Sequence, residues 1–115
     1  MTDAKRAQSE RLTSPVRGLP LDRVAEFCRK WKVRELAIFG SALRGELLPE
    51  SDVDFLVTFA AGSDWTLLDH FRMEEELGAI VGREVDLVNR IAVERSVNWL
   101  RRREILSSAR TVYAA

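Results

Sequence analysis

A strand-like run that ends in a Gly-Ser turn, followed by a second run that begins with alternating acids, constrains this chain most. Residues 35–39 are mainly apolar and predict a buried strand that ends at Gly40. Glycine allows a tight turn there and lets the backbone approach a ligand closely. Ser41 is placed to cap a short helix, and the free N–H groups at such a helix start attract phosphate. An ordinary capped turn explains the same two residues, so the turn alone does not specify a phosphate site.

Ten residues separate Ser41 from Asp52, which begins the second strand-like run, residues 52–59. Alternate side chains of a strand share a face and lie roughly 6.5–7 Å apart. We therefore expect Asp52 and Asp54 on one face, with residues 53, 55 and 57 on the other. Two carboxylates at that separation can hold a pair of divalent ions roughly 3.5–4 Å apart. Mg²⁺ suits such a site because it prefers oxygen ligands and accepts substrate phosphates. The alternative is a solvated strand edge whose acids deter aggregation.

Asp86 lies in the middle of a third strand-like run, residues 83–90. An acid in such a run costs free energy if it is buried without a partner, and a metal ion or a salt bridge would offset that cost. If this strand lies beside the strand of Asp52 and Asp54, Asp86 could ligate one ion and accept the proton of an attacking hydroxyl group. A surface acid on an edge strand is the alternative.

Charge is distributed unevenly along a chain whose formal net charge is zero. Residues 46–86 carry eleven acidic and two basic side chains, whereas the segments before and after them are net basic. An acidic site repels a triphosphate unless divalent cations bind with it. The pattern predicts metal-dependent nucleotide binding and argues against direct nucleic-acid binding by this chain, which would need a basic surface.

The joint pattern resembles the signature of the DNA polymerase beta-like nucleotidyltransferase superfamily, and more narrowly that of the minimal nucleotidyltransferases, or MNT domains. The matching residues are Gly40, Ser41, Arg44, Gly45, Ser51, Asp52 and Asp54, with Asp86 in the place of the third carboxylate. The resemblance implies an α/β (α+β) fold, a short mixed β-sheet with helices packed mainly on one face. It also implies catalytic and metal-binding roles for Asp52, Asp54 and Asp86, with two Mg²⁺ ions. The residues implied to bind the substrate ATP are Gly40, Ser41, Arg44 and Ser51.

The resemblance further implies a partner, a HEPN-domain ribonuclease toxin. MNT domains of this kind act as antitoxins by moving AMP from ATP onto a tyrosine of the toxin. Two other functions remain open, namely an inactive module that neutralises the toxin by occlusion and a transferase that acts on a small hydroxyl compound. For Arg44, a phosphate contact and a structural salt bridge are equally favoured. A homo-oligomer and a hetero-oligomer are both open.

The chain organisation predicts one domain. At 115 residues with 46% hydrophobic content there is room for a single core. We expect a flexible N-terminal segment at residues 1–19 and one nucleotidyltransferase domain at residues 20–115. The expected helices span residues 21–32, 65–81 (stopped near Gly82) and 93–108. One cysteine, Cys28, no apolar leader and no membrane-length apolar run favour a cytoplasmic protein without membrane contact.

Four other features are interpreted more plainly. His70 has no cysteine or second histidine for a zinc site and is expected on a helix surface. Cys28 is interpreted as a small core residue. The tryptophans are expected to be core anchors rather than base-stacking platforms, at positions 31, 65 and 99. The three arginines 101–103 are interpreted as a solvated basic face, with a patch that meets an acidic partner or the nucleotide as the alternative.

Overall fold

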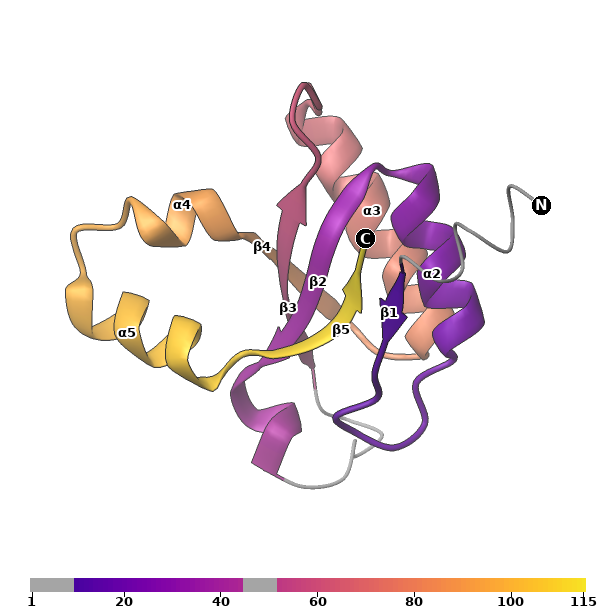
Figure 1. Cartoon of the computed structure of the whole chain (residues 1–115), viewed down its shortest axis with the longest axis horizontal. Coiled ribbons are helices and arrows are strands. Elements are labelled where there is room, and N and C mark those ends of the chain that lie inside the picture. Colours follow the sequence, from indigo (N-terminus) through magenta and orange to yellow (C-terminus); the bar gives the residue numbers. More distant parts are fainter. Residues whose placement is uncertain (1–9, 45–51) are drawn as a thin grey trace.

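The computed structural model describes residues 10–44 and 52–115, with the backbone only at Ser41 and Arg44. A five-stranded mixed sheet lies at its centre, in the order β1-β5-β2-β3-β4, as Figure 1 shows. Neighbouring strands are antiparallel except β3 and β4, which are parallel. The strands are β1 (Arg11–Leu12), β2 (Val33–Phe39), β3 (Val53–Phe59), β4 (Val85–Asn89) and β5 (Arg110–Ala114).

Helices lie on both sides of this sheet (Figure 1). The larger core forms under α2 (Leu21–Lys30) and α3 (Leu67–Val81), on the face to which Val53, Phe55 and Val57 point. A smaller apolar cluster on the opposite face includes Val93 of α4 (Arg90–Glu94) and Ile105 of α5 (Trp99–Ser108). The predicted fold class is confirmed, and the two C-terminal helices add a minor second layer.

The parallel pair follows from the chain path. A chain that leaves β3 and returns in parallel must cross over the sheet, and α3 makes that crossover. α3 begins with a capping box in which the Thr66 side chain accepts the Asp69 backbone N–H and the Asp69 side chain accepts the Thr66 backbone N–H. The helix ends at Val81, directly before Gly82, as predicted. β3 and β4 therefore lie side by side, which places their acids in register.

The C-terminal region differs from the prediction. In place of one helix over residues 93–108, the structure has α4 and α5, separated by residues 95–98. Two asparagine side chains cap the N-termini of these two helices. Asn89 accepts the Ile91 N–H at 2.9 Å and ends β4, and Asn98 accepts the Arg101 N–H at 3.1 Å and begins α5. The break makes α4, residues 95–98 and α5 an arm that projects from the sheet (Figure 1).

The N-terminal segment also differs where the structure describes it. Residues 10–19 were expected to be flexible, yet β1 pairs with β5, and Val16 and Leu19 are buried in the core. β1 and β5 were not predicted, because each is short and pairs with residues far away in sequence. Residues 1–9 lie outside the described part of the chain. No described helix has the length and apolar character needed to cross a membrane.

Candidate active site

Gly40 follows β2 directly and begins a short 3₁₀ helix, η1 (Gly40–Arg44). Its φ angle is +83°, in the left-handed region that residues with a side chain rarely adopt. A Cβ atom built on Gly40 would lie 2.5 Å from the Asp54 Oδ2 atom. The backbone of the turn therefore packs directly against a carboxylate predicted to belong to the site.

Asp54 and Asp86 lie side by side on the same face of the sheet. They are register partners on the parallel strands β3 and β4, and neighbouring strands are about 4.8 Å apart. Asp54 is half-buried and Asp86 is exposed, whereas the neighbouring Val53 and Phe55 are fully buried on the opposite face. The predicted alternation along β3 is confirmed, and the two strands are neighbours, which was the condition for Asp86 to join the site. Asp52 is exposed and lies just before β3.

The electrostatics of this group are repulsive. Burial raises the pKa of the Asp54 carboxyl above its usual value, the negative charges of Asp86 and Asp52 raise it further, and the positive charge of Arg101 acts in the opposite direction. In the described part of the chain, the side chains of Asp54 and Asp86 have neither a hydrogen bond nor an ion pair. Two adjacent carboxylates that no direct ion pair among the described residues neutralises form a site that favours a cation.

The donor set fits Mg²⁺ in part. Among residues 10–44 and 52–115, no three His, Cys, Asp or Glu side chains converge closely enough to hold a metal ion by themselves. Mg²⁺ needs no such cage, because it is usually bound through one or two carboxylates together with water and substrate phosphates. Asp54 and Asp86 supply that arrangement of oxygen donors. Additional ligands would come from a nucleotide.

A cavity of about 170 Å³ opens over the acids. It lies between the sheet and α5, and its lining residues are Phe39, Gly40, Asp54, Asp86, Arg101, Glu104, Ile105 and Ser108. The contribution of α5 was not identified from the sequence, which singled out only Arg101, as part of a basic face. The signal was present in the helical spacing of Arg101, Glu104 and Ser108, which recur after three and four residues and so share one face of a helix.

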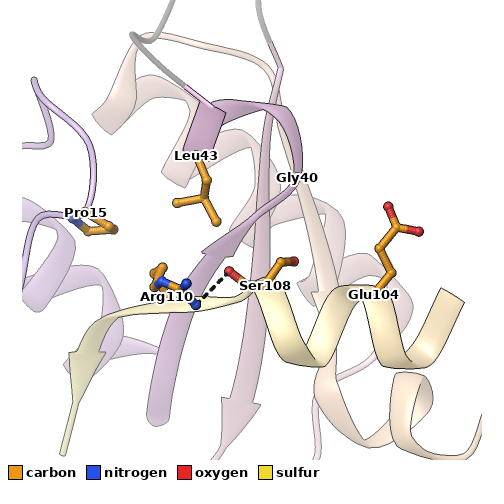
Figure 2. A pocket seen from close by; sticks show the side chains of 6 residues that line it. All are labelled: Pro15, Gly40, Leu43, Glu104, Ser108 and Arg110. Carbon is orange, nitrogen blue, oxygen red and sulfur yellow. Dashed lines mark hydrogen bonds between the residues drawn. The ribbon is translucent and has the colours of Figure 1, made fainter. Parts of the chain in front are cut away.

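A larger cavity of about 550 Å³ adjoins the first at Gly40, Glu104 and Ser108. Figure 2 shows Pro15, Leu43 and Arg110 as the remaining lining residues. The Arg110 Nη1 atom donates to the Ser108 carbonyl oxygen at 3.3 Å, which holds this guanidinium beside the end of α5. The two cavities give an elongated ligand room to extend across Gly40, from the acids to the guanidinium group of Arg110.

The other predicted site residues cannot be placed in the same way. Ser41 and Arg44 belong to η1, but their side chains are outside the description. Ser51 lies outside the described residues altogether. No contact with a ligand or with another side chain is therefore assigned to these three residues.

Three of the plainer expectations are met. Cys28 is fully buried. His70 lies on α3, with its Nε2 atom 3.8 Å from the Glu74 Oε2 atom. Trp31 and Trp65 pack edge to face at 5.1 Å between ring centroids. Trp99 corrects the expectation of a core anchor, because 56% of this residue is exposed at the start of α5.

Comparison with known proteins places this geometry in context. The profile of a family described as a nucleotidyltransferase domain matches residues 21–112. The protein adenylyltransferase MntA of Thermococcus cleftensis is 37% identical over 81 residues, which are 70% of this chain and 80% of that protein. A solved structure provisionally named a minimal nucleotidyltransferase is 30% identical, has a TM-score of 0.60 and aligns over 94% of this chain and 92% of its own.

One further solved structure shares the fold at low sequence identity. It is a complex of a tri-AMPylated HEPN toxin of Shewanella oneidensis with an MNT antitoxin. A chain of that complex matches with a TM-score of 0.52 and 13% identity, over 83% of this chain and 70% of that one.

Proposed function

The chain belongs to the nucleotidyltransferase domain family, and from this premise we propose that it moves AMP from ATP onto a tyrosine hydroxyl of a HEPN-domain toxin and thereby acts as an antitoxin. That it is a nucleotidyltransferase follows from the family. Support for AMP as the transferred group comes from the similarity to MntA, a named protein adenylyltransferase. Support for the partner comes from the fold shared with a complex of an AMPylated HEPN toxin and an MNT antitoxin.

The observation that carries the proposal is the position of Asp54. Its carboxylate lies beside Asp86 on the neighbouring strand and directly against the Gly40 backbone. Carboxylates for a cation and a glycine turn for phosphates therefore meet at one point of the sheet. A solvated strand edge would not need a glycine whose missing side chain leaves room for a half-buried acid.

In the proposed mechanism, Asp52, Asp54 and Asp86 would hold Mg²⁺, which when bound neutralises the phosphate charge. Gly40 and Ser41 bind the β- and γ-phosphates through backbone N–H groups, which carry partial positive charge at the start of η1. The resemblance to the minimal nucleotidyltransferases implies two ions. To hold both, Asp52 would act together with Asp54 and Asp86, which are paired in the sheet.

The chemical step is an in-line displacement at the α-phosphorus. The tyrosine oxygen of the acceptor forms a bond to that phosphorus, the bond to the bridging oxygen breaks, and pyrophosphate leaves. Asp86 is exposed beside Asp54 and accepts the proton of the attacking hydroxyl group. Positioning and charge stabilisation by the preorganised site supply most of the rate enhancement.

The test is the substitution Asp54→Asn, which keeps the shape of the side chain and removes its charge. Purified chain, ATP, Mg²⁺ and the cognate HEPN-domain toxin are combined, and intact mass reports AMP on the toxin. We expect Asp54→Asn to lower the transfer rate by about 10²–10³-fold. The matched control is Asp64→Asn, an exposed acid in the loop before α3, which should retain the wild-type rate.

Chelation of divalent cations with EDTA should stop transfer, and added Mg²⁺ should restore it. An Asp54→Asn protein that labels its acceptor at the wild-type rate would refute the assignment. Equal neutralisation of the toxin without ATP or Mg²⁺ would favour occlusion in place of transfer.

A further inference from the structure

The tip of the C-terminal arm exposes large apolar side chains. Val97 is 99% exposed, Leu100 62% and Trp99 56%. The three residues occupy the connection from α4 and the first turn of α5, on the part of the molecule that projects from the sheet (Figure 1). Within α5 only Ile105 is buried and Leu106 packs partly against the smaller cluster, so the apolar side chains at the start of the helix do not belong to the core.

A ten-residue helix with so little packing is marginal in water by itself. Exposed clusters of large apolar residues on small proteins commonly mark contact sites for other macromolecules. Trp is moreover among the residues that contribute most to binding energy at protein interfaces. These features indicate that something covers the arm tip, which we define as Val97, Trp99 and Leu100.

The arm tip is followed along α5 by residues that line the acidic cavity. Leu100 and Glu104 are four residues apart on α5, so they are neighbours on one face, with about 5–6 Å between their Cβ atoms. Glu104 lines the cavity that contains Asp54 and Asp86. A macromolecule that covers Leu100 is therefore one helical turn from a side chain that lines the cavity of the acids.

The border of the arm tip is basic. Arg95 and Arg103 are exposed, and neither has an ion pair within residues 10–44 and 52–115. An apolar centre with a cationic border matches a partner with an apolar depression bordered by Asp and Glu. Single-stranded RNA fits less well, because Trp99 alone among the three residues of the arm tip offers a ring on which a base can stack.

We propose that the arm tip is the docking surface for the protein that receives AMP, and that this docking carries the acceptor hydroxyl to the cavity. The inference rests on the proposed function and adds the surface through which the acceptor binds. A second exposed apolar group, on α3, does not serve this role, although Leu68 is 58% exposed there. α3 covers the face of the sheet opposite to the acids, so a protein bound to it would lie away from the chemistry.

The central experiment compares Leu100→Glu with Leu68→Glu. The two leucines are similarly exposed, both lie on helices, and one is on the arm tip. Affinity for the cognate HEPN-domain toxin is measured by biolayer interferometry, AMP transfer by intact mass, and ATP binding to the chain alone by calorimetry with Mg²⁺.

We expect Leu100→Glu to weaken toxin binding by about tenfold or more and to lower transfer at subsaturating toxin, with ATP binding unchanged. Leu68→Glu should match the wild type in all three measurements. The pair Arg95→Glu and Arg103→Glu should slow association and reduce its dependence on salt.

Opposite outcomes overturn the inference. Leu100→Glu that binds the toxin with wild-type affinity excludes docking at the arm tip. A substitution that only converts a dimer of this chain to monomers, measured by light scattering, assigns the surface to self-association. A substitution that only weakens binding of a labelled RNA oligonucleotide assigns the surface to nucleic-acid binding. Toxin binding that persists in Asp54→Asn, with transfer also at the wild-type rate, refutes the proposed chemistry but leaves the docking surface standing.

Discussion

Replacement of Gly40 by alanine tests the contact between the turn and the carboxylate. The added Cβ atom would lie 2.5 Å from Asp54 Oδ2, closer than nonbonded atoms approach each other, and the φ angle of +83° strains any residue with a side chain. The left-handed conformation costs about 1–2 kcal/mol. The clash itself costs little stability, because the carboxylate is the free end of a side chain and can rotate away. That rotation moves Asp54 out of the site.

The expected result is therefore a large loss of activity with a modest loss of stability. A displacement of about 1 Å in a catalytic group can lower a rate by about 10²-fold. Gly40→Ala should lower AMP transfer by at least that factor, and urea denaturation should show a destabilisation of about 1–2 kcal/mol.

The matched control is Gly62→Ala. Gly62 has a φ angle of +85°, and its added Cβ atom would meet nothing within 4 Å. The control should show the same destabilisation and retain the wild-type transfer rate. If both variants lose stability equally and both remain fully active, the close contact between Gly40 and Asp54 has no role in the reaction.

Three further predictions concern stability and titration. Because burial and neighbouring charge raise the pKa of Asp54, ionisation of this carboxyl destabilises the fold. Asp54→Asn should therefore be at least as stable as the wild type at pH 7. Any gain in the free energy of unfolding over the wild type should disappear as the pH falls through that pKa. Lower stability of Asp54→Asn at pH 7 would contradict the repulsion. Glu74→Ala removes the acceptor of the Leu87 N–H, which is bonded at 2.8 Å on β4 next to Asp86, and should cost about 1–2 kcal/mol in urea denaturation. Replacement of its exposed neighbour, Glu75→Ala, should change stability by less than about 0.5 kcal/mol. Burial raises the pKa of Tyr113, the single tyrosine, to about 12; absorbance near 295 nm should report that value, and the resulting stability, fully present below about pH 10, should be lost as the pH rises toward 12.

Much of the central fold was predictable because its signals are local. The alternation of Asp54 with Val53 and Phe55 specified which face of β3 is buried, and the structure confirms it. The helical spacing of apolar residues in α2 and the glycine after α3 also allowed those helices to be located. The resemblance to the minimal nucleotidyltransferases is confirmed by the family match and by a relative structure that aligns over most of both chains.

The elements that were missed depend on distant partners. β1 is two residues long, and it becomes a strand because Leu12 pairs with Tyr113, about a hundred positions later. Within the predicted C-terminal helix, Asn98 caps the start of α5, and this cap was not recognised in the sequence.

The sequence by itself determined which residues could share a face, because side chains return to the same face every two residues in a strand and every 3.6 residues in a helix. Only the tertiary structure decided which faces meet. It set Asp54 beside Asp86 through a parallel pairing, brought Gly40 against the same carboxylate, and laid Arg101 and Glu104 of α5 over both acids. These contacts join segments that no local pattern connects, and they form because burying the two apolar faces of the sheet leaves the chain few other ways to fold.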